Sequence, residues 1–400
     1  MRQVDVAIVG GGLAGSVAAA MLGRAGVSTA LIEPHRIYPP DFRSEKIDEA
    51  QLRLLQRTGL DEAVLRAATP TDELWIARFG RLVERRRMPQ YGIFYDTLVH
   101  AIRSQVPESV EALEAKATSI SSGRDRQVIA LSTGEEISAR LIVLSTGLNN
   151  GLRHTLGMER DELSKCHSIS LGFMVRPVGG ATFRFPALTY YAEKSTQRSA
   201  FFTVFPIGSK MRSNMFVYRS SRDPWLEELR RSPEQAILGA LPGLRKFTGE
   251  FEVEGLRIRP VDLYRIRGCE RPGVVLIGDA FSTSCPAAGT GINKVLTDAE
   301  RLCNLYIPRW LATPGMGAEK IAAFYQDPAK KACDAASYVK AYYLRSFSID
   351  NGLRWRAHRG FKFIGQLAVG RISQLIREDP STQLGRGAGT GDAPVLDGRI

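Results

Sequence analysis

The sequence predicts an α/β protein in which a domain built on a parallel sheet carries an inserted, mainly antiparallel β domain and is followed by C-terminal helices. Three observations support this fold class. Residues 4–33 read as a strand, a glycine-rich turn, a helix and a second strand. Residues 168–254 contain strand-like segments rich in aromatic side chains, and residues 273–306 repeat the order of buried strand, glycine-bearing loop and helix.

The first unit has the order expected of a site for the ADP part of a dinucleotide. Gly10 permits a tight turn, Gly12 lets the backbone approach a pyrophosphate, and Gly15 lets the helix pack closely on the strand. The helix N-terminus offers N–H groups and a partial positive charge to the phosphates. Glu33 is placed to accept both hydroxyls of an adenosine ribose, which a turn used only for packing would not require. The predicted binding residues are Gly10, Gly12, Leu13, Ala14, Gly15 and Glu33.

A proline-interrupted loop follows and leads into a helix that ends at Gly59. Arg43 and Lys46 lie where this loop can return over the cofactor, so we predict that both contact it; solvated surface charge is the alternative. The next elements expected are strands 75–79 and 82–87, helix 94–106, and strands 115–120, 127–132 and 137–145.

Residues 168–254 are expected to form the second domain, with strands at 170–175, 182–193, 199–205 and 214–219. Side chains alternate between the faces of a strand, so one face of this sheet packs in a core and the other can line a pocket. Individually, the aromatic side chains are expected in the core more often than at a substrate. They are Phe173, Phe183, Phe185, Tyr190, Tyr191, Phe201, Phe202 and Phe205.

The second glycine-bearing unit begins with the buried strand 273–279 and continues into a helix that starts near Gly291. Backbone N–H groups of residues 289–293 would gather at this helix N-terminus, where they can stabilise developing negative charge. Helices are then expected at 318–326, 328–347 and 361–378. The last is amphipathic and basic, so it packs on the body of the protein or lies on a membrane surface. Residues 381–400 are expected to be disordered.

Composition limits the classes of protein that remain. The chain has 400 residues with 44% hydrophobic content, enough for a large core and two domains. We expect a cytoplasmic protein, because no apolar run approaches the roughly 20 residues that span a bilayer and the first strand leaves no room for a signal peptide. The five cysteines are scattered, so neither disulfides nor a zinc site is expected.

The net charge of +12 favours an anionic partner: a phosphate-bearing cofactor, an acidic substrate or carrier, or a membrane surface. A basic surface that serves only solubility is the alternative. We do not expect nucleic acid binding, because the basic residues are dispersed and no recognition motif is present.

Two glycine-bearing units separated by an aromatic antiparallel domain resemble the FAD-dependent monooxygenases with the p-hydroxybenzoate hydroxylase-like fold, the group A aromatic hydroxylases. Gly10, Gly12, Gly15 and Glu33 match the ADP fingerprint of that family. Residues 278–299 match its second motif, in which GDA is followed by a proline, GxGxN and a DA pair. The resemblance covers about residues 1–310 and implies a Rossmann-like FAD-binding domain (GR2-type).

The resemblance also implies roles in binding FAD. Asp279 would accept hydrogen bonds from the ribityl chain, Pro286 would lie along the flavin ring, and the amides of Gly291–Asn293 would face its N1 and O2 edge, where negative charge gathers on reduction. Cys285 would contact flavin or substrate, or fill space as a small apolar side chain. The residues expected here are Asp279, Pro286, Gly289, Gly291, Ile292 and Asn293.

The division into domains follows from the same resemblance. We predict a discontinuous FAD-binding domain at 1–75, 98–160 and 257–310, a substrate domain at 76–97 and 161–256, a C-terminal helical region at 311–380, and the tail.

The sequence departs from the family pattern in two places, and the first of them bears on the electron donor. Family members that accept NADH or NADPH directly usually carry a middle motif near ADGxxSxxR. Here Thr146 replaces its aspartate and Asn150 its serine, while Gly147 and Arg153 are kept. The histidine common after GDA is Ser282.

The activity implied is insertion of one oxygen atom from O2 into an aromatic or olefinic small molecule through a flavin 4a-hydroperoxide. Alternatives are an enzyme of the same fold supplied by a partner reductase, a geranylgeranyl reductase-like double-bond reductase, and a flavin-binding protein without turnover. Tyr190, Tyr218 and His167 are candidates for a general base that the sequence does not rank. Peripheral membrane contact would involve the basic C-terminal helices.

Overall fold

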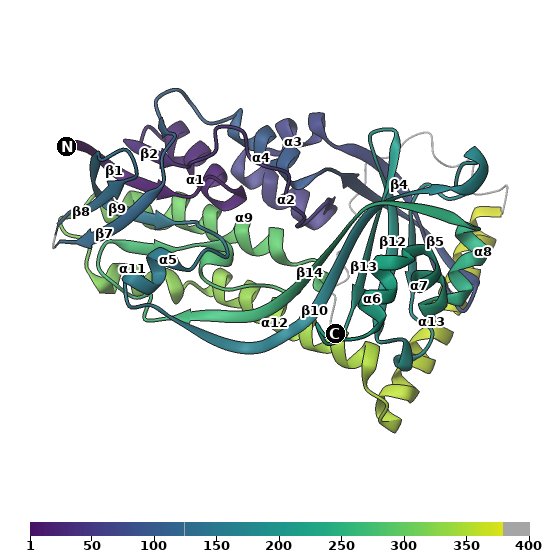
Figure 1. Cartoon of the computed structure of the whole chain (residues 1–400). Helices are drawn as coiled ribbons and strands as arrows, with labels where there is room; N and C mark the ends of the chain where they lie inside the picture. Colours follow the sequence, from purple (N-terminus) through teal and green to yellow (C-terminus); the bar gives the residue numbers. More distant parts are fainter. Residues whose placement is uncertain (124, 379–400) are drawn as a thin grey trace.

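The computed structural model describes residues 1–123 and 125–378, and the predicted disordered tail lies outside them. Two sheets form two lobes, which the long strands β10 (Glu159–Pro177) and β14 (Phe251–Arg267) connect (Figure 1). The α/β class is confirmed.

The first sheet has the order β6-β2-β1-β9-β8-β7, and β15 also pairs with β9. β1 pairs in parallel with β2 and β9, β2 with β6, and β9 with β15, whereas β7 and β8 are antiparallel. The apolar run of β9 is buried at the centre, as its sequence indicated. The strands are β1 (Arg2–Val9), β2 (Thr29–Ile32), β6 (Glu111–Leu113), β7 (Ala117–Ser122), β8 (Gln127–Leu131), β9 (Glu136–Leu144) and β15 (Val274–Leu276).

Helices pack on this sheet through small and aliphatic side chains. α1 is buried along nearly its whole length, because its alanines and glycines let it approach both the sheet and α9. α2 begins at a capping box formed by Asp48 and Gln51 and ends at Gly59, whose φ is +66°. The helices of this lobe are α1 (Leu13–Arg24), α2 (Glu49–Thr58), α3 (Asp61–Ala67), α4 (Tyr95–Arg103), α5 (Gly151–Thr155) and α9 (Gly291–Arg301).

The second sheet has the order β14-β10-β13-β12-β11-β4-β5-β3 and is antiparallel except where β11 meets β4. The expected strand at 182–193 is wrong in extent: only Leu188–Tyr191 is a strand, β11. Pro186, which has no N–H to donate, lies two residues before this strand. The other strands are β3 (Lys46–Asp48), β4 (Thr69–Arg78), β5 (Arg81–Gly92), β12 (Ser199–Ile207) and β13 (Lys210–Val217).

The two faces of the second sheet have different environments. One face packs under α6 (Trp225–Arg231), α7 (Pro233–Ala240) and α8 (Arg245–Thr248), which lie over it in Figure 1. Phe173, Tyr190 and Phe202 are fully buried there. The other face looks toward the first lobe.

The strand pairing cuts across the predicted domain limits. β3 and the first half of β4 belong to the second sheet, and residues 257–267 pair with β10 as part of β14. The domain division itself stays a prediction.

The C-terminal helices extend along the molecule from the first lobe to the second (Figure 1). They are η6 (Leu302–Tyr306), α10 (Ile307–Leu311), α11 (Ala318–Tyr325), α12 (Pro328–Ile349) and α13 (Leu353–Glu378). α13 contacts the second sheet through Phe363, whose ring lies 5.1 Å from that of Phe79. Phe361 and Ile364, on the face expected to pack, are instead 76% and 63% exposed. Among residues 1–123 and 125–378, no helix combines the length and apolar character required for a membrane span.

Candidate active site

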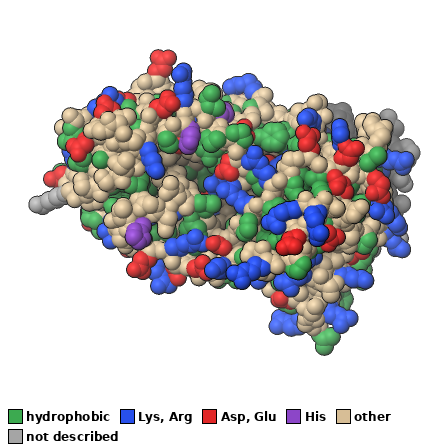
Figure 2. All heavy atoms as spheres, in the orientation of Figure 1, with side chains coloured by type: hydrophobic (Ala, Val, Ile, Leu, Met, Phe, Trp, Pro, Cys, Tyr) green, Lys and Arg blue, Asp and Glu red, His purple; other side chains and the backbone are tan. Residues whose placement is uncertain are grey.

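One cavity, of about 450 Å³, lies between the two lobes and brings both glycine-bearing units together. Leu13 lines it from the first unit, and Asp279, Pro286 and Gly291 line it from the second. The opposite wall is the face of the second sheet that α6, α7 and α8 do not cover, which we call the free face. Lys and Arg side chains gather between the lobes on the face seen in Figure 2.

The first glycine turn has the close packing that the sequence predicted. Gly10 has φ +102°, and a Cβ there would lie 2.7 Å from the carbonyl oxygen of Ser145. A Cβ on Gly15 would lie 1.9 Å from the carbonyl oxygen of Gly10, so helix and strand meet without side chains. A Cβ on Gly12 would meet no atom within 3.7 Å. Gly12 is therefore half-buried and free of close contacts, so that a pyrophosphate could approach its backbone.

Glu33 lies at the end of β2 beside this turn. Its Oε2 accepts from the N–H of Gly11 at 2.7 Å, and its Oε1 accepts from the N–H of His35 at 3.0 Å. Arg103 of α4 donates through Nε to the carbonyl oxygen of Gly11 at 2.9 Å and lies 3.7 Å from Glu33. A Cβ on Gly11 would collide with Arg103 and Glu33, so this glycine also has a packing role that the sequence did not indicate.

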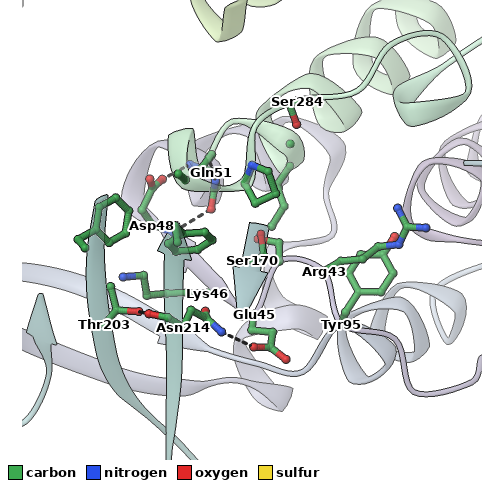
Figure 3. A pocket seen from close by; sticks show the side chains of 18 of the residues that line it. Arg43, Glu45, Lys46, Asp48, Gln51, Tyr95, Ser170, Thr203, Asn214 and Ser284 are labelled. Carbon is green, nitrogen blue, oxygen red and sulfur yellow. Dashed lines mark hydrogen bonds between the residues drawn. The ribbon is translucent and has the colours of Figure 1, made fainter. Parts of the chain in front are cut away.

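Arg43 and Asp279, both predicted to bind the cofactor, are in direct contact. Arg43 Nη1 donates to Asp279 Oδ2 at 2.7 Å, and Arg43 Nε donates to Asp41 Oδ2 at 2.6 Å. The guanidinium lies 5.7 Å from the ring centroid of Tyr95 (Figure 3). The loop after β2 thus returns over the second unit, as its position in the sequence predicted.

The second unit is held by groups behind it. Gly278 has φ +61°, and its N–H donates to Asp298 Oδ2 at 2.9 Å. Asp298 belongs to the DA pair of the family motif, and its other oxygen accepts from the buried Lys330 ammonium at 2.7 Å. The motif therefore positions the turn that carries Asp279.

Gln51 of α2, which the sequence analysis did not select, ties the glycine loop to the first lobe. Its Nε2 donates to the carbonyl oxygen of Gly289 and to Oδ1 of Asn293, both at 3.0 Å. With the Asn293 side chain held from α2, the N-terminal turn of α9 presents Gly291 and Ile292 to the cavity.

Arg153 of the middle motif is 1% exposed and has a structural role. Its Nη1 donates to the carbonyl oxygens of Gly147 at 3.0 Å and Ala280 at 2.6 Å. This contact fastens the middle motif to the GDA turn. Lys294 Nζ donates to Ser282 Oγ, the side chain at the position where the family commonly has histidine.

The substrate half of the cavity is built from alternate residues of the second sheet. In each strand the residue that points away from the helix-covered core points into the cavity, so Tyr191 and Phe201 line it while their neighbours Tyr190 and Phe202 do not. The residues of this wall are Leu74, Ile76, Arg86, Met88, Gln90, Ser170, Thr189, Tyr191, Phe201, Thr203, Asn214, Phe216, Arg259 and Val261.

A buried ion pair stands at one edge of this wall. Arg212 donates to both oxygens of Glu45, at 2.8 and 2.9 Å, and Asn214 Nδ2 donates to Glu45 Oε2 at 2.8 Å (Figure 3). Glu45 is thereby fully engaged. The pair fixes the crossing segment that carries Arg43 and Lys46.

Lys46 lies on the substrate wall, away from Asp279. Its ammonium lies 5.4 Å from the ring centroid of Phe205, and the side chain lines the cavity. Burial lowers the pKa of Lys46 from 10.5 to about 8, although the negative charge of Asp48 opposes this shift. Of the two basic residues predicted to contact cofactor, Arg43 alone is bonded to the second unit.

None of the three candidate bases lines the cavity. His167 is buried between Ser164 and the carbonyl oxygen of Ala341, and burial together with the charge of Arg345 lowers its pKa to about 4. Burial raises the pKa of both Tyr190 and Tyr218. Cys285 is also buried outside the cavity, so it fills space as a small apolar residue.

A cavity with a dinucleotide-binding turn at one end and an aromatic wall at the other defines the class of a flavin-dependent oxidoreductase. Residues 3–307 match the family described as "FAD binding domain", so the chain belongs to that family. The protein is an FAD-dependent monooxygenase of this family, and the p-hydroxybenzoate hydroxylase-like fold is confirmed.

Several known proteins are similar to this chain. A relative from Streptomyces platensis, 3-amino-4-hydroxybenzoate 2-monooxygenase PtnB3, is 24% identical over 317 residues, which are 75% of this chain and 78% of the relative. The solved structure of p-nitrophenol 4-monooxygenase PnpA from Pseudomonas putida DLL-E4 has a TM-score of 0.73 at 19% identity and covers 94% of this chain and 98% of that one. The structure of Pseudomonas aeruginosa PqsL in complex with 2-aminobenzoylacetate has a TM-score of 0.61 at 20% identity, with 86% and 97% covered.

Proposed function

We propose that this protein inserts one oxygen atom from O2 into an aromatic small molecule that lies against the free face of the second sheet. The observation that carries the proposal is the continuity of the cavity: the wall at Pro286 and Gly291 and the wall at Tyr191 and Phe201 face the same space. A cofactor held by the first wall would therefore meet a ring held by the second.

The residues of the first lobe fit FAD. Gly12 has no close contact where a pyrophosphate would approach, Glu33 stands at the end of β2 as a ribose would require, and Asp279 lines the cavity. The N-terminal turns of α1 and α9 add two sets of N–H groups directed at an anionic ligand. When bound, FAD would supply the electrons and the activation of oxygen.

The protein itself would position the substrate and exclude water. The substrate wall combines aromatic and aliphatic side chains with a few polar groups, a composition typical of sites for small aromatic ligands. PtnB3 and PnpA are named for aromatic substrates, which supports the same class of substrate here. A catalytic base is not part of the proposal, because His167, Tyr190 and Tyr218 lie outside the cavity.

The source of electrons is a separate part of the proposal. We propose NADPH or NADH as the donor, with a partner reductase as the alternative that Thr146 and Asn150 favour. Anaerobic mixing of the yellow protein with each nucleotide distinguishes them: direct donors bleach the flavin, whereas dependence on a reductase leaves it oxidised until dithionite is added.

The test of the activity is incorporation of labelled oxygen. The FAD-loaded protein, a reductant and ¹⁸O2 are mixed with 3-amino-4-hydroxybenzoate, p-nitrophenol and related aromatic compounds, and the products are analysed by mass spectrometry. One ¹⁸O atom per product molecule is expected. Reduction of a double bond without uptake of oxygen, or no product with any reductant, would contradict the proposal.

A further inference from the structure

We propose that the substrate is an aromatic carboxylate, and that Lys46 and Gln90 bind its carboxylate group. The inference rests on the proposed function, because it concerns the substrate half of the same cavity. It assigns to Lys46 a contact with substrate in place of the predicted contact with cofactor. The Lys46 side chain projects into the cavity among Asp48, Thr203 and Asn214 (Figure 3).

The charges around the cavity identify Lys46 as the cation available for a ligand. Arg43 and Arg259 are paired with Asp41, and Arg86 is paired with Glu84 at 2.8 Å. Lys340 also lines the cavity, but its side chain is exposed to solvent. Within residues 1–123 and 125–378, Lys46 forms no ion pair, and its ammonium lies 5.4 Å from the ring centroid of Phe205.

A cation in this environment gains most from an anionic ligand. Asp48 lies two positions further along β3 and attracts Lys46, but its carboxylate also caps α2 by accepting from Gln51 N at 2.9 Å. A buried ammonium without an ion-pair partner loses hydration without a full replacement. A substrate carboxylate would supply the missing counter-charge, and few existing contacts of Lys46 would be lost when it binds.

Gln90 provides an independent second group. It is 2% exposed and lines the cavity, and neither its Nε2 nor its Oε1 has a hydrogen-bond partner among the described residues. A buried amide without partners costs free energy, so such a group facing a cavity indicates a polar ligand. Its N–H donors suit a carboxylate oxygen.

The strand register places these two groups together. In the antiparallel pair of β3 and β5, Lys46 is opposite Gly92 and Asp48 is opposite Gln90. Lys46 and Gln90 are therefore diagonal neighbours on one face, a separation of roughly 7–8 Å between backbones that long side chains can close. Two donors on adjacent strands can each take one oxygen of a carboxylate, whereas a phenolate offers only one oxygen.

The remaining neighbours leave room for an aromatic ring. Leu74, Ile76 and Met88 line the same end of the cavity, and Phe205 packs with them behind Lys46. An aromatic acid could thus place its charged group between β3 and β5 and its ring on the apolar side chains. Neutral phenols would bury the ring but leave Lys46 without a counter-charge.

Binding measurements on the FAD-loaded protein test the inference without turnover. The protein is titrated with 3-amino-4-hydroxybenzoate and with 3-amino-4-hydroxybenzamide, which has the same ring but no charge, and the flavin absorbance reports binding. The acid is expected to bind at least tenfold more tightly than the amide. Lys46→Met and Gln90→Met should each weaken binding of the acid about tenfold or more and change binding of the amide little.

The control is Lys331→Met, an exposed lysine of α12 outside the cavity, which should leave both affinities unchanged. Equal affinity for acid and amide, no binding of the acid at millimolar concentration, or a larger loss in Lys340→Met than in Lys46→Met would overturn the inference. Turnover of neutral phenols with no preference for acids would leave the proposed function standing and remove only this inference.

Discussion

Arg43 and Asp279 form an ion pair across 236 positions of the chain, with 2.7 Å between Nη1 and Oδ2. The contact closes the loop after β2 over the turn after β15, so the two halves of the predicted cofactor site share one wall. A bound cofactor with an anionic pyrophosphate and a hydroxylated chain would find an arginine and a carboxylate already oriented toward the cavity.

The first prediction concerns this carboxylate. Asp279→Ala removes an acceptor at the cavity but leaves Arg43 paired with Asp41, so the fold should be retained. We expect FAD affinity to fall at least tenfold, measured by fluorescence titration of the apoprotein. Asp161→Ala, which breaks a surface pair with Arg267, is the matched control and should not change FAD affinity. Unchanged affinity in Asp279→Ala would contradict the assignment.

The second prediction separates two glycines of one turn. Gly15→Ala places a Cβ 1.9 Å from a backbone oxygen, so the apoprotein should lose stability or fail to fold. Gly12→Ala places its Cβ in a space with no atom closer than 3.7 Å, so the apoprotein should keep its melting temperature within about 2 °C. Because that space is where we place the pyrophosphate, Gly12→Ala should nevertheless bind FAD at least tenfold more weakly.

Melting curves with and without FAD check this pair of variants. FAD should raise the melting temperature of the wild type but raise that of Gly12→Ala much less. Normal FAD binding by Gly12→Ala would show that the pyrophosphate lies elsewhere.

The third prediction concerns the buried arginine of the middle motif. Arg153→Met removes the donor that holds the carbonyl oxygens of Gly147 and Ala280, and leaves both without that bond. We expect a loss of about 2–4 kcal/mol in the free energy of unfolding. Urea unfolding of the apoprotein measures it.

The control for this variant is Arg160→Met, which removes a partly exposed arginine paired with Asp262 and should cost less than about 1 kcal/mol. If both substitutions had the same small effect, Arg153 would not be the link between the two motifs.

Local patterns in the sequence predicted the first glycine unit well, because its strand, turn, helix and second strand follow one another within residues 2–32. The same holds for the run of β9 and for the α9 N-terminus. The contacts of Gln51 and Arg103 could not be predicted in this way. Each joins elements far apart in the chain, and neither has a spacing or a neighbour that distinguishes it from a surface side chain.

The substrate wall shows a second reason for incomplete prediction. Alternation predicts that neighbouring strand residues face opposite sides, but not which side is the core. Tyr190 and Tyr191 are both aromatic, as are Phe201 and Phe202, so composition does not distinguish the two faces. Helices α6 and α7 cover one face of the sheet, and Tyr190 and Phe202 on that face are therefore core residues. Their neighbours Tyr191 and Phe201 lie on the other face and line the cavity.

The last prediction uses Lys46 to link stability and pH. Its pKa is lowered by burial from 10.5 to about 8, so between these pH values the unfolded chain binds a proton that the folded protein does not. The buried charge of Lys46 therefore lowers the free energy of unfolding by its full amount below pH 8. This destabilisation disappears as the pH rises toward 10.5. A shift of one pKa unit corresponds to about 1.4 kcal/mol, so the lowered pKa of Lys46 destabilises the folded protein by roughly 3 kcal/mol at most. Water in the cavity would reduce this destabilisation.

Lys46→Met should therefore be more stable than the wild type at pH 7, by about 1–3 kcal/mol, and the difference should shrink at pH 9.5. The charge that acts on this lysine is that of Asp48 on its own strand, which attracts the ammonium and opposes the effect of burial. Urea unfolding of the apoproteins at both pH values gives the difference, with Lys331→Met as a variant that should show none. If the wild type were more stable than Lys46→Met at pH 7, the prediction would be wrong. The ammonium would then already have a partner in the protein, because a buried charge stabilises the fold only when another group pairs with it.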